Sequence, residues 1–200
     1  MSLAQEIAAA SAVWIVDHGL DYAAARRKAL EHLGLEGRRG VEVPDNLALE
    51  DAVREHIALF CADTQPGELL ALRRLALSWM ERLAPFQPHL GGAVWRGVAT
   101  RDSPLLIDLY TDDPTAPEIE LHNQGVRLET GERPGRGREP VPVIGIEALC
   151  PELQERVPLE ISVWPSDDLR GALQADARGR SWRGNRAALH KLIEESSSRG

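Results

Sequence analysis

The sequence predicts an α+β fold, in which a mixed sheet of about five strands is covered by helices and follows an amino-terminal helical segment. Two observations favour this class. Apolar residues recur at helical spacing up to about residue 83, and from about residue 89 they alternate with the period of a β-strand. The chain shows no internal repeat of the kind that indicates a solenoid.

Four helices are predicted in the first part of the chain, because the apolar-periodic runs are bounded by start and stop signals. Asp21 is a suitable N-cap for the second run, and Gly34 closes it. Thr64 precedes the fourth run, and Pro85 stops it. The predicted helices span residues 3–17, 22–33, 47–61 and 66–83.

Strand patterns alternate with short helices in the remainder of the chain. The strands are predicted at residues 89–95, 105–110, 126–130, 141–149 and 157–164, and the helices at 113–123, 167–174 and 186–195. A run of strands after a run of helices is typical of an α+β chain. We therefore expect a helical segment over residues 1–64 and an α+β domain over residues 65–200.

Composition excludes several classes of protein. A net charge of −8 argues against a general nucleic-acid binder, because binding to backbone phosphates needs a basic face. Cys61 and Cys150 are single and far apart, which argues against a structural zinc site and fits a reducing, cytoplasmic environment. The first residues carry Glu6 and Asp17 and no basic cluster, so neither a signal peptide nor a membrane helix is expected.

The stretch from Gly91 to Asp113 contains the residue that most needs an explanation. In the strand Leu105–Tyr110, Asp108 lies between apolar neighbours, and a carboxylate there is costly unless it is paired, bound to a metal or solvated. The simplest interpretation is that Asp108 lies on a solvent-exposed face of the sheet. The functional interpretation is that Asp108 belongs to a binding or catalytic site.

Known phosphate and hydrolase motifs are absent: the chain has no GxxxxGK[ST], GxGxxG, HExxH or GxSxG pattern. The same stretch nevertheless resembles the signature of the DNA polymerase β-like nucleotidyltransferase superfamily, particularly its minimal members. Gly92, the Arg96-Gly97 pair and Ser103 match the glycine, arginine-glycine and serine positions of that signature. The resemblance covers about residues 66–165 and implies a nucleotidyltransferase-like fold with these four residues at a ligand site.

The resemblance does not extend to the metal-binding residues of the family. The two metal-binding aspartates of the family fall on Pro104 and Leu106, which cannot supply the oxygen ligands that Mg²⁺ requires. Asp108, two residues later on the same strand face, is the candidate catalytic residue and metal ligand. Glu147 and Glu160 are the candidates for a further metal-binding carboxylate. The pattern therefore suggests a site that is degenerate at its acidic pair, with Mg²⁺ as the cofactor if transfer survives.

A second candidate site is the arginine-rich stretch DARGRSWRG. Arg180 and Arg183 could bind phosphate bidentately, and Trp182 could stack on a base. The alternative is a surface loop in which Trp182 packs on the domain and the arginines pair with acidic neighbours. The same alternative is favoured for an exposed hairpin loop that carries Arg133, Arg136 and Arg138.

Three hypotheses of function remain. The first is a nucleotidyltransferase-like domain that binds a nucleotide or another phosphate-bearing small molecule, with transfer activity weak or lost. The second is an active Mg²⁺-dependent nucleotidyltransferase. The third is a non-catalytic interaction module that forms a homo-oligomer or binds a protein partner through its amino-terminal helices.

Overall fold

The structure, a computed structural model, describes residues 2–135 and 139–197, and the chain divides into two compact units. The first unit comprises Met1–Leu69 together with Val98–Ser103. The second comprises Leu70–Gly97 together with Pro104–Gly200.

The first unit is built from α1 (Leu3–His18), α2 (Tyr22–His32) and α3 (Asn46–Phe60). Each helix begins where a short polar side chain satisfies its first N–H groups. Asp21 accepts hydrogen bonds from the N–H groups that open α2, and Asp45 accepts one from the N–H of Ala48 in α3. The predicted amino-terminal helices are confirmed, with bounds that shift by one or two residues.

The second unit contains a mixed sheet, as predicted, but with one strand more than expected. In the described part of the chain its six strands follow the order β3-β4-β5-β2-β1-β6. Strands β2 and β5 are parallel, and the other neighbouring pairs are antiparallel. The strands are β1 (His89–Gly91), β2 (Leu105–Tyr110), β3 (Glu129–Pro134), β4 (Pro140–Cys150), β5 (Glu155–Trp164) and β6 (Gly184–Asn185).

The two faces of β2 differ as the alternating sequence predicts. Leu105, Ile107 and Leu109 are at most 1% exposed, whereas Leu106 and Asp108 on the opposite face remain partly accessible. The helices of this unit are α5 (Gly92–Arg96), α6 (Ala116–Asn123), α7 (Leu169–Ala172) and α8 (Arg186–Ser197), joined by most of α4 (Gln65–Arg82).

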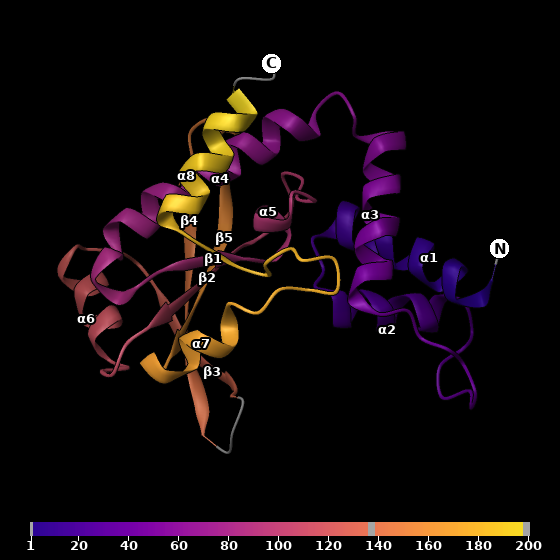
Figure 1. Cartoon of the computed structure of the whole chain (residues 1–200), viewed down its shortest axis with the longest axis horizontal. Coiled ribbons are helices and arrows are strands. Elements are labelled where there is room, and N and C mark those ends of the chain that lie inside the picture. The colour runs from indigo at the N-terminus through magenta and orange to yellow at the C-terminus, as the bar shows by residue number, and fades with distance from the viewer. Residues whose placement is uncertain (1, 136–138, 198–200) are drawn as a thin grey trace. The chain divides into compact units, whose positions relative to one another are not determined.

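Helices α4 and α8 lie side by side (Figure 1). The buried Arg73 of α4 joins them, because its Nη1 donates to Ser196 Oγ at 3.3 Å. Burial lowers the pKa of the Arg73 guanidinium. No helix in residues 2–135 and 139–197 has the length and hydropathy of a membrane-spanning segment.

The expected strand over residues 89–95 is wrong beyond Gly91. Gly92 has φ of +63°, which turns the chain out of the sheet and starts the short helix α5. Gly97, with φ of +77°, ends that helix. A Cβ at Gly92 would come within 2.9 Å of Leu106 Cδ1, so the glycine also permits close packing on β2.

Strand β6, which was not predicted, depends on a glycine next to an indole ring. A Cβ built at Gly184 would lie 1.9 Å from Cη2 of Trp95, closer than any real contact. The N–H of the same ring donates to the carbonyl of Ser181 at 3.0 Å. Trp95 therefore holds the segment that leads into β6.

We expect Gly184→Ala to destabilise the protein by about 1–3 kcal/mol, because the added methyl group overpacks the Trp95 ring. Gly131→Ala in β3 is the matched control, since a Cβ there meets nothing within 4 Å. Urea denaturation of both variants measures the difference. Equal stabilities would show that the Trp95 ring moves aside without cost.

Candidate functional site

The candidate site lies on the partly accessible face of the sheet, and strand register explains which residues meet there. Asp108 is opposite Ser162 of β5, and Leu106 is opposite Glu160 of β5 and Gly91 of β1. Because side chains on one face recur every second residue, these residues all share a face.

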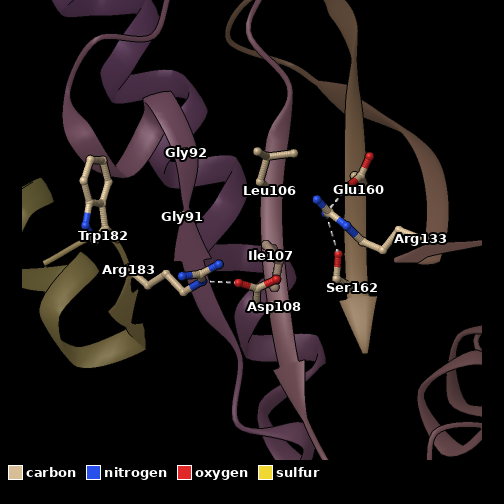
Figure 2. A pocket seen from close by; sticks show the side chains of 10 residues that line it. All are labelled: Gly91, Gly92, Leu106, Ile107, Asp108, Arg133, Glu160, Ser162, Trp182 and Arg183. Atoms are coloured by element: carbon tan, nitrogen blue, oxygen red, sulfur yellow. Dashed lines mark hydrogen bonds and ion pairs between the residues drawn. The ribbon is translucent and has the colours of Figure 1, made fainter. Parts of the chain in front are cut away.

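These residues line a cavity of about 290 Å³. Figure 2 shows Trp182 and Arg183 on one side of it, and Arg133, Glu160 and Ser162 on the other, with Leu106 between them. Gly91 and Gly92 add backbone without side chains. The cavity thus has an apolar base, an aromatic wall and two guanidinium groups.

Both carboxylate oxygens of Asp108 accept hydrogen bonds from protein donors. Its Oδ1 accepts a hydrogen bond from Trp164 Nε1 at 2.8 Å, and its Oδ2 accepts one from Arg183 Nε (Figure 2). The side chains of Asp108 and Arg183 are 13% and 26% exposed. The carboxylate in the apolar strand is therefore compensated by an ion pair and an indole N–H.

A second ion pair closes the opposite wall. Arg133 Nη1 donates to Glu160 Oε1 at 3.0 Å and to Ser162 Oγ at 3.2 Å. Arg133 comes from the edge strand β3, so its side chain reaches across β4 to β5. Gly145 of β4, opposite Glu160 in register, leaves room on this face because it has no side chain.

Trp182 and Arg183 belong to the loop Asp176–Arg183. Arg96 holds this loop through hydrogen bonds to the Asp176 side chain and the Ser181 carbonyl. Arg96 Nη2 donates to Asp176 Oδ2 at 2.6 Å, and the two side chains are 3% and 1% exposed. The Arg96 guanidinium also lies over the Trp182 ring, 4.3 Å from its centroid.

Asp176 organises the loop around its carboxylate. Its Oδ1 accepts hydrogen bonds from the backbone N–H groups of Arg178 at 2.8 Å and Arg180 at 2.9 Å. Burial alone would raise the pKa of this carboxyl, but the hydrogen bonds from the Arg180 N–H, the Arg96 side chain and the Arg178 N–H lower it to about 2. Asp176 is therefore ionised at neutral pH.

The structure brings together five of the residues that the sequence nominated. Gly92, Asp108, Glu160, Trp182 and Arg183 all line the cavity.

Five nominated residues lie elsewhere. Arg96, in α5, supports the loop, and Gly97 ends that helix. Arg180 does not line the cavity, and its Nε lies 3.8 Å from Asp176 Oδ2. Ser103 belongs to the first unit, where its buried hydroxyl accepts a hydrogen bond from the Thr100 N–H at 3.0 Å. Glu147 is exposed on β4.

Sequence reasoning had assigned Arg133 to an exposed hairpin loop, and it did not nominate Ser162. Arg133 lies within β3, and strand pairing from β3 to β5 is what brings it to the cavity. The other two arginines of that hairpin, Arg136 and Arg138, lie outside the described residues. No local sequence signal could have identified Arg133, because its partners are 27 and 29 residues away.

The three nominated carboxylates do not fit a Mg²⁺ ion as they stand. Both oxygens of Asp108 accept protein hydrogen bonds, and Glu160 is paired with Arg133. Glu147 of β4 is opposite Pro158 of β5, which precedes Ser162, the residue opposite Asp108, by four residues. Glu147 therefore lies two strands away from Asp108 and four residues out of register with it. Among the described residues, no three His, Cys, Asp or Glu side chains are grouped to hold a metal ion.

No protein-family model matches the chain, and no curated protein does. Among solved structures, it is similar to a mutant of Cid1 poly(U) polymerase bound to MgATP, with 15% identity, a TM-score of 0.36, and coverage of 56% of this chain and 38% of that one. The complex of Cid1 with the UTP analogue UMPNPP is 14% identical, with a TM-score of 0.35 and coverage of 59% of this chain and 37% of that one.

The chain thus spans less than two fifths of the length of the Cid1 chains that it matches. A likeness at these TM-scores does not define the site, and its chemistry has to be derived from its own residues.

We expect Asp176→Asn to lower the melting temperature at pH 5, with a difference from wild type that narrows as the pH falls towards 2. The folded-state pKa of about 2 is below the ordinary value of 3.8, so the stabilisation is complete above pH 4 and is lost as the pH falls through 2. Thermal unfolding from pH 5 to pH 2 measures this. Asp167→Asn, an exposed aspartate, is the control and should match wild type throughout. A pH-independent difference for Asp176→Asn would show that the carboxylate charge does not stabilise the loop.

Proposed function

We propose that this chain is a nucleotidyltransferase-like domain that binds a nucleotide, or another phosphate-bearing ligand, in the sheet-face cavity, with transfer activity weak or lost. The observation that carries the proposal is the pair of guanidinium groups on facing walls of one cavity. Arg133 and Arg183 both line it, although they come from strand β3 and from the loop before β6.

Each guanidinium retains donors for a ligand. Arg183 uses Nε for Asp108, and Arg133 uses Nη1 for Glu160 and Ser162. Among the described residues, Nη1 and Nη2 of Arg183 and Nε and Nη2 of Arg133 make no further hydrogen bond. Planar pairs of such N–H groups suit the bidentate recognition of phosphate oxygens.

The remaining walls favour a ligand that also carries a ring. One face of the Trp182 indole is covered by Arg96, and the residue lines the cavity beside the base formed by Leu106. Stacking on an aromatic side chain tolerates every base, because each base has a π-face. The volume of about 290 Å³ lies at the lower end of small-molecule pockets.

We propose weak or lost transfer activity because the carboxylates that would hold Mg²⁺ are either replaced or already paired. Phosphoryl and nucleotidyl transfer require charge neutralisation at the phosphates, which Mg²⁺ ions held by carboxylates supply. Pro104 and Leu106 stand at the positions of the family's acidic pair, and Asp108 is engaged by Arg183 and Trp164.

The interaction hypothesis has one specific observation in its favour. Leu59 and Phe60, at the end of α3, are 69% and 72% exposed, although both are large and apolar. We therefore retain a protein partner or a second copy of the chain as the alternative. Size-exclusion chromatography of Leu59→Ser/Phe60→Ser against wild type would separate it from ligand binding, which this variant should leave unchanged.

We expect nucleoside triphosphates to raise the melting temperature, and Arg133→Gln to weaken that response. A ligand at 100 times its Kd adds about 2.7 kcal/mol of stability, which a thermal-shift titration resolves. Arg127→Gln is the matched control, because Arg127 is an exposed arginine just before β3 and does not line the cavity. Equal responses from both variants would place any binding site elsewhere, and no response from wild type would refute nucleotide binding.

We also expect Trp182→Leu to weaken binding of ATP and UTP by about 1–3 kcal/mol while leaving inorganic tripolyphosphate unaffected. The indole would contact the base, whereas the guanidinium groups would contact the phosphates. Isothermal titration calorimetry with the three ligands measures both effects. If tripolyphosphate binding falls equally, Trp182 supports the loop and does not contact the base.

A further inference from the structure

We propose that the guanidinium of Arg183 takes the place of a divalent cation beside Asp108, so that the cavity accepts its phosphate-bearing ligand without a metal ion. The inference about the ligand rests on the proposed function. The inference about Arg183 and Asp108 rests only on the geometry of the described residues.

The first argument is that both oxygens of the Asp108 carboxylate already accept a hydrogen bond. Trp164 Nε1 donates to one oxygen at 2.8 Å, and Arg183 Nε donates to the other. A hard divalent cation binds through oxygen lone pairs directed at it. A cation at Asp108 would have to compete with a guanidinium that already neutralises the carboxylate.

The second argument is that, in the part of the chain that the structure describes, the other carboxylate of the cavity is already paired. Glu160, the remaining acidic side chain of the cavity, is held by Arg133 at 3.0 Å. Leu106, between the two carboxylates on the same face, offers no ligand atom. Among the described residues that line the cavity, the positive charges are therefore those of Arg133 and Arg183.

The third argument is that Arg183 is held in place before any ligand binds. On one side, the loop is fastened by the Arg96–Asp176 pair and by Trp95 Nε1, which donates to the Ser181 carbonyl. On the other side, Gly184 pairs with Leu90 in the sheet. A cationic group that is already ordered binds an anion with a smaller entropic cost.

Asp108 is thereby a positioning residue. Because its Oδ2 holds Nε, the position of the guanidinium is fixed, and its Nη groups are left for phosphate oxygens (Figure 2). The charge of one guanidinium and the fork of its N–H groups would do what a metal ion bound to the carboxylate would otherwise do: neutralise and orient the phosphate.

The first arm of the test needs no nucleotide. Mn²⁺ binding is followed by electron paramagnetic resonance for wild type, Asp108→Asn, Arg183→Met and the Arg183→Met/Asp108→Asn double variant. We expect wild type and Asp108→Asn to bind Mn²⁺ equally, because Arg183 already occupies the carboxylate. Arg183→Met should bind more Mn²⁺ than the double variant, because it exposes Asp108.

A loss of Mn²⁺ binding in Asp108→Asn relative to wild type would overturn the proposal, since Asp108 would then be a metal ligand in the native protein. Circular dichroism checks that each variant is folded. Should Asp108→Asn fail to fold, the comparison of wild type with Arg183→Met decides alone: equal Mn²⁺ binding would refute the displacement by Arg183.

The second arm measures binding of UTP and inorganic tripolyphosphate by calorimetry, in EDTA and in Mg²⁺. We expect wild type to bind at least as tightly in EDTA as in Mg²⁺, and Arg183→Met to bind at least tenfold more weakly in EDTA. Arg186→Met, which removes an exposed arginine at the start of α8, should bind like wild type.

Binding that requires Mg²⁺ would overturn the metal-independent site while sparing the proposed function. Absence of binding under both conditions would refute the proposed function and the ligand part of this inference. The Mn²⁺ arm would still decide whether Arg183 occupies the place of the cation.

Discussion

The arrangement of the cavity depends on the buried ion pair between Arg96 and Asp176. Isolated buried charges are costly, but here the carboxylate receives two backbone N–H groups besides the 2.6 Å contact with the guanidinium. Arg96 in turn forms the support on which the Trp182 ring lies. One pair thus fixes the loop fold, the orientation of the indole and the place where Arg183 enters the cavity. Without it, a short glycine- and arginine-rich segment would have little reason to be ordered.

Much of the fold could be predicted from the sequence, because it is encoded in short-range patterns. The caps at Asp21 and Asp45 and the alternation in Leu105–Tyr110 act within a few residues, and the helices and β2 follow from them. The errors at Gly92 and at β6 have long-range or conformational causes. Gly92 leaves the strand because of a positive φ that a glycine permits but does not demand. Strand β6 pairs with β1, and its Gly184 lies against Trp95, which is 89 residues earlier in the chain.

The site was predictable in part, and the limit again lies in long-range pairing. An aspartate in an apolar strand requires compensation, so Asp108 could be singled out, but the sequence left a wet face, a metal and a partner as open explanations. The partners that the structure supplies, Trp164 and Arg183, lie 56 and 75 residues further along the chain. In the same way, Arg96 could be aligned with a family motif, whereas its burial against Asp176 could not be deduced from that motif.

The charges of the cavity also determine how it can select a ligand. Asp108 and Glu160 balance Arg133 and Arg183, so the four charged residues that line it sum to zero in a chain of net charge −8. Long-range attraction of an anion is therefore weak or unfavourable, and it would not provide the steering that basic clefts give to nucleic acids. Any affinity for phosphate has to arise at short range, from N–H groups whose positions are fixed by the ion pairs themselves. Such a site discriminates by geometry more than by charge, because a misplaced anion meets a carboxylate as readily as a guanidinium. This favours a small ligand with its anionic group at one defined distance from a stacking ring.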